Sequence, residues 1–162
     1  MRHHIQQEYA NTLRDAPWRA MVTLTTPSPR SRLWWSTETS AWLDEVQERH
    51  RMNVAWLSCY ERQPQLHSHW MLAAPGSIDC KAAEQYWIER LRTKDSQHAK
   101  VEPFDPLRGG LRYVLKTWGT FDDEINWSDN LRLFRPSPDI DSLNSRAKRN
   151  LRHILAQARA NN

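Results

Sequence analysis

Two histidines separated by one residue, His67 and His69, have the type and spacing that metal binding needs. If this segment is a strand, both imidazoles lie on one face, because strand side chains alternate between faces. A turn centred on Pro64 would place Glu61 directly opposite His67, with their Cβ atoms roughly 5 Å apart. Two imidazole nitrogens and a carboxylate suit a first-row divalent ion and leave positions open for substrate oxygens. The sequence therefore predicts that Glu61, His67 and His69 bind Mn²⁺ or Mg²⁺.

An isolated His-x-His pair is more simply explained as two polar residues on a solvated strand face. The position of Glu61 favours the metal site, and Glu102 is a weaker candidate for a further ligand. A closed structural zinc site would need a fourth protein ligand, which the sequence does not offer. We interpret the remaining histidines as surface or hydrogen-bonded residues: His3, His4, His50, His98 and His153.

A tyrosine and a lysine, Tyr113 and Lys116, follow the histidine pair by about forty residues. They fall on a helix expected over residues 106–118, where Tyr113 lies off the apolar stripe and Lys116 lies one turn away on the same flank. A phenol has an ordinary pKa of about 10, so a metal on the phosphate oxygens and a nearby ammonium would help it attack phosphorus. Alternatively, Tyr113 borders an amphipathic helix and Lys116 is solvated.

The elements that would position these residues can be predicted from periodicity and from turn residues. Their central order is strand-helix-strand-strand-helix-strand, the split βαβ or ferredoxin-like arrangement. We therefore expect an α+β fold with a central antiparallel sheet of four to five strands and flanking helices. The predicted strands are 18–26, 53–61, 67–74, 99–104 and 126–134, and the predicted helices are 3–14, 36–51, 79–93, 106–118 and 139–158.

Length and composition are consistent with one soluble domain over residues 1–162, with a core at about 18–135. The formal net charge is +4 and the pI is about 9.3, so a polyanionic partner is plausible but not required. No apolar run has membrane-spanning length, and the first residues lack the apolar core of a signal peptide. Cys59 and Cys80 match no metal-ligand spacing and are expected to be small packed residues. We expect a cytoplasmic protein with no membrane partner.

Basic residues near the proposed chemistry, Arg108 and Arg112, are candidates for DNA contact. A further group lies on the predicted basic amphipathic helix at 139–158, where it could bind phosphates with salt-dependent affinity. That group is Arg146, Arg149 and Arg152, and the alternative is that it forms the solvated face of a packed helix. Trp34 and Trp35 could stack on bases, but we favour a hydrophobic staple at the start of the following helix.

Three motifs, in this order along the chain, resemble those of rolling-circle replication initiators of the HUH endonuclease superfamily. A threonine-rich strand matches residues 22–26, the histidine pair matches 67–69, and the tyrosine followed by lysine matches 113–116. The resemblance covers about 18–119, which is most of the chain. Each motif is short, so its specificity lies in order, spacing and placement on strand, strand and helix.

The resemblance implies a metal-dependent endonuclease that nicks one DNA strand at a replication origin, usually where a hairpin exposes it. Tyr113 would become joined to the 5′ phosphate, assisted by Lys116, and the free 3′ hydroxyl would prime synthesis on a plasmid or phage. His67 and His69 would hold the metal with an acidic or polar third ligand, which we assign to Glu61. No nucleotide-binding Gly-x-x-x-x-Gly-Lys motif is present, so a host helicase and polymerase are implied as partners.

Two residues depart from the family pattern. Ser68 stands where a hydrophobic residue is preferred, and Thr117 stands where some relatives carry a second tyrosine, so termination would need another subunit or nucleophile. Related alternatives are a single-tyrosine transposase, which usually has glutamine in place of Lys116, and a relaxase, which usually has a third histidine. A different class is a non-catalytic module that binds single-stranded nucleic acid on an RRM-like sheet. That module would need exposed aromatics, for which Trp56, Tyr60 and Trp70 are the candidates.

Overall fold

The computed structural model describes residues 13, 16–61, 67–108, 124–128 and 131. Its strands and helices follow the alternating and helical patterns of the sequence. The strands are β1 (Trp18–Leu24), β2 (Ala55–Glu61), β3 (His67–Ala73), β4 (Ala99–Pro103) and β5 (Glu124–Trp127). The α-helices are α2 (Arg32–His50) and α3 (Cys80–Leu91), and short 3₁₀ helices cover Ser96–His98 (η1) and Pro106–Arg108 (η2).

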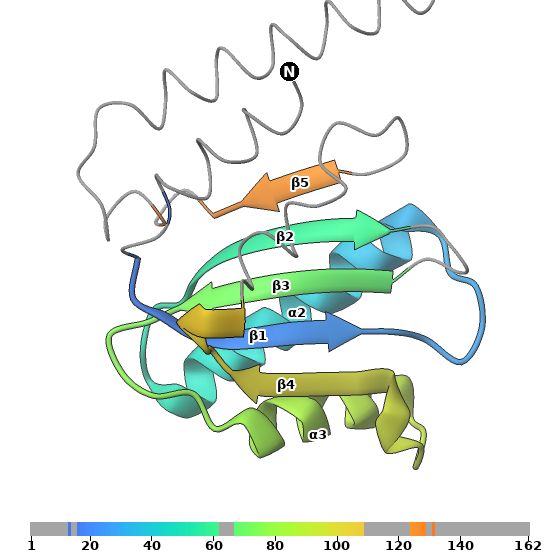
Figure 1. Ribbon diagram of the computed structural model, residues 1–162. Helices are drawn as coiled ribbons and strands as arrows, with labels where there is room; N and C mark the ends of the chain where they lie inside the picture. The colour runs from blue at the N-terminus through green and yellow to red at the C-terminus, as the bar shows by residue number, and fades with distance from the viewer. Residues whose placement is uncertain (1–12, 14–15, 62–66, 109–123, 129–130, 132–162) are drawn as a thin grey trace, which may run out of the picture.

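The strands pair in the order β4-β1-β3-β2-β5, and every neighbouring pair is antiparallel (Figure 1). The first four strands and the two helices follow the chain order β1-α2-β2-β3-α3-β4, which is the split βαβ arrangement. This confirms the predicted α+β fold. The edge strand β5 begins two residues earlier than predicted and ends at Trp127.

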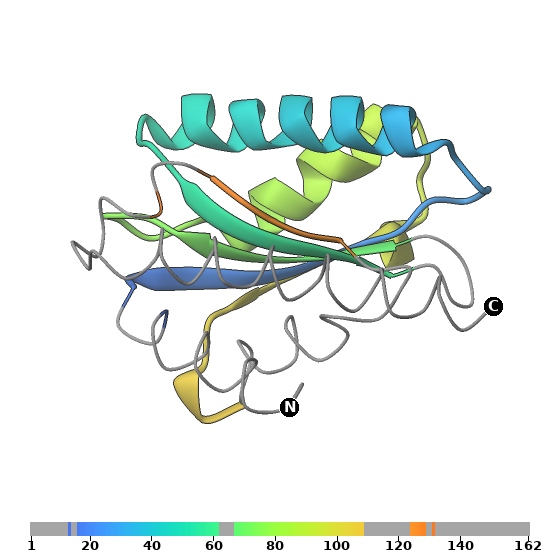
Figure 2. The same cartoon turned by 90° about the horizontal axis from the view of Figure 1, so that it is seen from above.

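Both α-helices cover the same face of the sheet, as seen from above in Figure 2. The side chains that β1 directs to the helices are apolar, namely Ala20, Val22 and Leu24, all at most 1% exposed. The intervening residue Thr23 points to the opposite face, because strand side chains alternate. The face away from α2 and α3, which we call the open face with reference to these two helices alone, carries Thr23 of β1. It also carries fully buried side chains of β2 and β3, namely Leu57, Cys59 and Met71.

The helix α2 begins earlier than the sequence predicted. Ser31 is the N-cap, with its hydroxyl oxygen accepting a hydrogen bond from the Trp34 amide at 3.1 Å, so the predicted start at residue 36 or 37 is wrong. Trp34 and Trp35 lie in the first turn of the helix, not before it. Trp35 is fully buried and stacks on Trp87 of α3 with ring centroids 5.6 Å apart. Its role is therefore core packing.

The helix α3 is capped at its start and is bound to α2 near both of its ends. Asp79 caps its start by accepting from the Ala82 amide at 3.0 Å. The Trp42 indole donates to the Ala83 carbonyl at 2.9 Å, and Arg90 forms an ion pair with Glu38 at 2.7 Å. The two helices thus form a rigid layer behind the sheet.

The three aromatic residues proposed for an RRM-like platform do not lie on an open sheet surface. Tyr60 and Trp70 are buried in the core beneath the helices, and Trp56 is half-buried on the same side. The reason is the strand alternation, which puts Glu61 and His69 on the open face and their aromatic neighbours on the helix-covered face. The alternative of a non-catalytic module therefore finds no exposed platform in these three residues.

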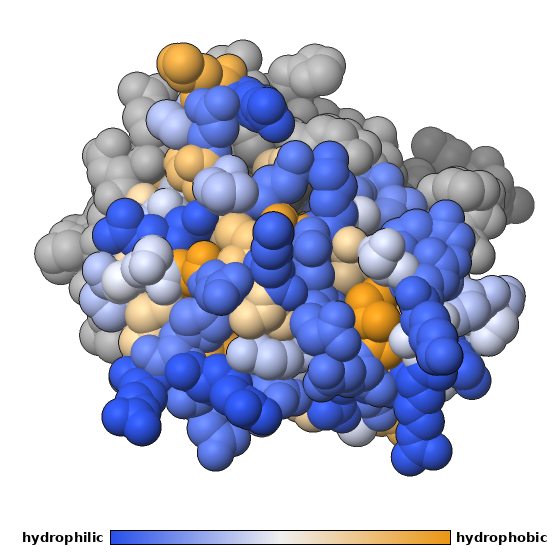
Figure 3. Space-filling model, turned by 90° about the horizontal axis from the view of Figure 1, so that it is seen from below, coloured by the Kyte–Doolittle hydropathy of each residue, from blue (hydrophilic) through white to orange (hydrophobic). Residues whose placement is uncertain are grey.

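Seen from the side of α3 and β4, the surface is mostly hydrophilic, and its apolar atoms are scattered rather than joined in one patch (Figure 3). None of the helices among the described residues has the length and hydropathy needed to cross a bilayer. The predicted helices at 3–14 and 139–158 lie outside the described residues, except for Leu13. Of the predicted helix at 106–118, only the 3₁₀ turn η2 is described.

Candidate metal centre

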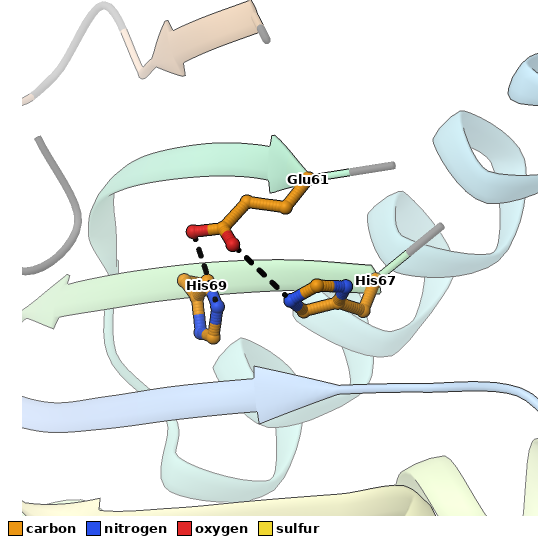
Figure 4. Close-up of side chains that lie close together, drawn as sticks. All are labelled: Glu61, His67 and His69. Carbon is orange, nitrogen blue, oxygen red and sulfur yellow. Dashed lines mark ion pairs between the residues drawn. The ribbon is translucent and has the colours of Figure 1, made fainter. Parts of the chain in front are cut away.

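The hairpin of β2 and β3 places the three predicted ligands together. Glu61 pairs with His67 across the two strands, as the sequence predicted from their equal distances to the turn. His69 lies two residues further along β3 on the same face. Figure 4 shows the Glu61 side chain extending from the end of β2 toward both imidazole rings on β3.

Distances within this cluster suit a single divalent ion. One carboxylate oxygen of Glu61 lies 3.5 Å from His67 Nε2, and the other lies 3.5 Å from His69 Nε2. All three ligand atoms lie within 4.8 Å of one another. With metal bonds of about 2.1–2.2 Å, a pair of ligands 3.5 Å apart subtends roughly 105–115° at the ion. That angle is compatible with tetrahedral or distorted octahedral coordination, so the residues fit a metal.

The surroundings of the cluster are partly shielded from water. The side chains of Glu61 and His67 are 14% and 15% exposed, and that of His69 is 5% exposed. The imidazole rings meet edge to face with centroids 4.9 Å apart. Two nitrogen ligands and one carboxylate gathered in a shielded place form a stronger attraction for a cation than the same groups would in water.

Thr23 of β1 forms a hydrogen bond with His69, the more buried of the two histidines. Thr23 pairs with His69 across β1 and β3, and its Oγ1 lies 3.0 Å from His69 Nδ1. In the tautomer that a metal ligand needs, Nδ1–H donates to Thr23 and the lone pair is on Nε2, which faces Glu61. The threonine-rich motif therefore acts as a positioning element for the histidine motif.

A row of open-face residues extends the site across four strands. Cys59 pairs with His69, His69 with Thr23, and Thr23 with Lys100. The sequence analysis did not single out Lys100, whose side chain is exposed and forms an ion pair with Glu102 at 3.0 Å. Alternation within the predicted strand at 99–104 indicates the face of Lys100, but its alignment with His69 depends on the pairing of non-consecutive strands.

Only some of the other predicted site residues lie in the described part of the chain. Arg108 lies in η2, is exposed, and forms ion pairs with Glu102 at 3.8 Å and Asp105 at 3.5 Å. Glu102, the weaker ligand candidate, is engaged with Lys100 and Arg108 and is not part of the metal cluster. The remaining predicted residues lie outside the described part of the chain: Tyr113, Lys116, Arg112, Arg146, Arg149 and Arg152.

The two other described histidines are hydrogen-bonded within the fold, as predicted. His98 Nδ1 lies 3.0 Å from Oγ1 of Thr25, the residue that follows β1. His50 Nδ1 lies 2.7 Å from the Val46 carbonyl oxygen, and its Nε2 accepts from the Asp79 amide at 2.8 Å. The second bond requires His50 Nε2 to be unprotonated, so this ring links the end of α2 to the start of α3.

No protein-family model matches the chain, and no curated protein matches it. A solved structure with a similar shape is that of the hypothetical protein ORF119 from Sulfolobus islandicus rod-shaped virus 1. It is 15% identical in sequence and superimposes with a TM-score of 0.48. The match covers 68% of this chain and 91% of the viral protein.

Proposed function

We propose that the chain is a metal-dependent, site-specific enzyme that nicks and rejoins single-stranded DNA at a replication origin. In this proposal it initiates rolling-circle replication of a plasmid or phage through a covalent phosphotyrosine at Tyr113. The observation that carries the proposal is the convergence of Glu61, His67 and His69 on the open face of a split βαβ sheet. The order of the three sequence motifs supports the choice of DNA as substrate.

The ligand set can act as a Lewis acid site with room for a phosphodiester. Glu61, His67 and His69 would hold the ion, and three protein ligands leave coordination positions for phosphate oxygens. When bound, the ion would polarise the phosphate and neutralise charge that develops in the transition state. Thr23 maintains the His69 tautomer that ligation requires, and Lys100 supplies a positive charge in the same row of the sheet.

The covalent step balances without a further reactant. The Tyr113 hydroxyl loses its proton as its oxygen attacks phosphorus, and the bond from phosphorus to the 3′ oxygen breaks. The leaving oxygen takes up a proton and becomes the 3′ hydroxyl that primes synthesis. Lys116 would stabilise the phenolate or the pentacovalent phosphate. Attack by a 3′ hydroxyl on the phosphotyrosine reverses the step and rejoins the strand.

A labelled pool of random single-stranded oligonucleotides tests this proposal without knowledge of the origin. The pool is incubated with the protein and Mn²⁺, and products are separated under denaturing conditions. We expect a 3′ label to travel with the protein, because the protein is joined to the 5′ phosphate of the downstream fragment. A 5′ label should appear on a shortened free strand.

Single substitutions test which residues are needed to form the covalent adduct. Tyr113→Phe should form no adduct, and His67→Ala should form none in Mn²⁺ while keeping the circular dichroism spectrum of the parent. An adduct that persists in Tyr113→Phe, or cleavage that persists in His67→Ala, contradicts the assignment of that residue. Tight binding of an intact oligonucleotide, with no adduct under any metal, favours the non-catalytic module.

A further inference from the structure

A second candidate site lies on the side of the sheet opposite the metal cluster. It is a cavity of about 760 Å³ between α2 and the helix-facing residues of β2, and it extends to β5. The edge strand β5 lies next to β2, and Asn126 of β5 and Ser128 just after it are part of the lining. Cavities of a few hundred to about 1,000 Å³ are typical of small-molecule sites.

One wall of this cavity is a polar stripe of α2. Ser36, Ser40 and Asp44 are exposed and spaced by four residues, so they follow one another along one side of the helix. Arg32 begins the same stripe one turn earlier, in the first turn of α2. With a rise of about 1.5 Å per residue, Arg32 and Asp44 are separated by roughly 18 Å along the axis. The cavity therefore has a cationic end and an anionic end.

The other wall is aromatic and held in place. Trp56 is half-buried, and its ring lies 5.1 Å from that of Trp70, centroid to centroid. Ser128 forms hydrogen bonds with both backbone groups of Trp56. The Ser128 Oγ accepts from the Trp56 amide at 2.8 Å, and the Ser128 amide donates to the Trp56 carbonyl at 3.0 Å. An indole fixed in this way is a preorganised surface for stacking of a planar ring.

Arg32 is also held, because its guanidinium lies over the Tyr60 ring, 3.9 Å from the centroid. A planar guanidinium with fixed orientation suits two-point binding of phosphate. In the floor of the cavity, the Ser58 hydroxyl is buried and has no hydrogen-bond partner in the described part of the chain. A buried hydroxyl without a partner is costly, and rotation of the Ser58 side chain toward the cavity would let a polar ligand group satisfy it.

We propose that this cavity binds a nucleotide unit, with its base stacked on Trp56 and its phosphate on Arg32. An apolar ligand would leave the Ser58 hydroxyl unsatisfied and would place no negative charge opposite Arg32. A nucleotide combines a planar polar ring with one anionic end. The proposal does not depend on the metal centre, because the two sites lie on opposite faces of the sheet.

Equilibrium dialysis of the full-length protein, in EDTA to exclude the metal centre, tests this assignment. The probes are radiolabelled deoxyadenosine monophosphate, a labelled trinucleotide, and inorganic phosphate as competitor. Arg32→Gln removes the phosphate contact, and Ser40→Trp fills the cavity from an exposed helix position. The matched controls are Arg49→Gln, which also removes an α2 arginine placed near an aromatic ring, and Glu48→Trp, at an exposed α2 position outside the cavity lining.

We expect saturable binding of about one nucleotide per chain, weakened roughly tenfold or more by Arg32→Gln and abolished by Ser40→Trp. Both controls should bind within about twofold of the parent. If the mononucleotide shows this pattern, the ligand is a free nucleotide; if only the trinucleotide shows it, the ligand is part of a strand.

The proposal is overturned if neither probe binds, if binding is unaffected by Arg32→Gln and Ser40→Trp, or if inorganic phosphate competes as well as the nucleotide. Trinucleotide binding that is insensitive to both variants would place DNA on another surface. That result would reject the cavity assignment and leave the proposed nicking function standing.

Discussion

The hydrogen bond between Thr23 and His69 gives a sharp test of how the candidate metal centre is held. Thr23→Val replaces the hydroxyl by a methyl group of nearly the same shape on a β-branched residue, so the strand preference of the position is kept. The substitution removes the acceptor that lies 3.0 Å from His69 Nδ1. No metal ligand is changed.

The expected loss of Mn²⁺ affinity follows from the burial of His69. His69 is only 4% exposed, so bulk water has little access to replace the threonine hydroxyl. Loss of a partner by a buried polar group costs about 1–3 kcal/mol, and loss of an outer-shell partner of a metal ligand typically weakens metal affinity roughly 10- to 100-fold. We expect Mn²⁺ affinity to fall at least about tenfold, while the free energy of unfolding without metal falls by only about 1 kcal/mol.

The assay is titration with Mn²⁺ monitored by the electron paramagnetic resonance signal of the free ion. Thr25→Val is the matched control, since Thr25 is on the same segment and makes the equivalent 3.0 Å contact with Nδ1 of His98. We expect it to leave Mn²⁺ affinity within about twofold of the parent. Equal affinities for the parent and Thr23→Val, or an equal loss in both variants, would refute the positioning role.

Three further outcomes test other parts of the structure. Glu61→Gln removes the one charged ligand of the cluster and should weaken Mn²⁺ binding by more than Thr23→Val does, with an unchanged fold; calorimetric titration that finds parental affinity would contradict the ligand set. His50→Ala removes one hydrogen bond within α2 and one between α2 and the N-cap of α3, and it should lower the urea unfolding free energy by about 1–2 kcal/mol without changing Mn²⁺ affinity; an unchanged midpoint would contradict the link. Burial, reinforced by the carboxylates of Glu84 and Asp79, raises the pKa of the Cys80 thiol. Because the thiolate is the reactive form, iodoacetamide should alkylate Cys80 more slowly than free cysteine at about pH 8. The alkylation rate should continue to increase with pH at pH values above the ordinary cysteine pKa. Equal rates for Cys80 and free cysteine, measured by mass spectrometry, would contradict this.

The local parts of the fold and site were accessible from the sequence. The pairing of Glu61 with His67 follows from counting residues on either side of a short turn, and the alternation of β3 places His67 and His69 together. The order of strands and helices followed from periodicity and from turn residues. These features depend on neighbours in the chain, which a sequence displays directly.

Features that depend on distant segments were not accessible. The contact between Thr23 and His69 requires β1 to pair with β3 in one particular register, and nothing local fixes that register. Likewise, alternation separates Tyr60 from Glu61 but does not say which face the helices will cover. The start of α2 was misplaced for a different reason: Ser31 and Ser36 are both acceptable caps, and burial of Trp35 against α3 selects the earlier one.

The most direct test of the central claim is the identity of the residue that becomes joined to DNA. Trypsin cleavage after Arg112 and Lys116 should release the peptide Tyr-Val-Leu-Lys, residues 113–116, from the adduct formed in Mn²⁺. After nuclease digestion, we expect mass spectrometry to find this peptide carrying a nucleotide 5′ phosphate on Tyr113. A nucleotide on any other peptide, or an adduct that forms equally when Glu61, His67 and His69 are all replaced by alanine, would contradict the account.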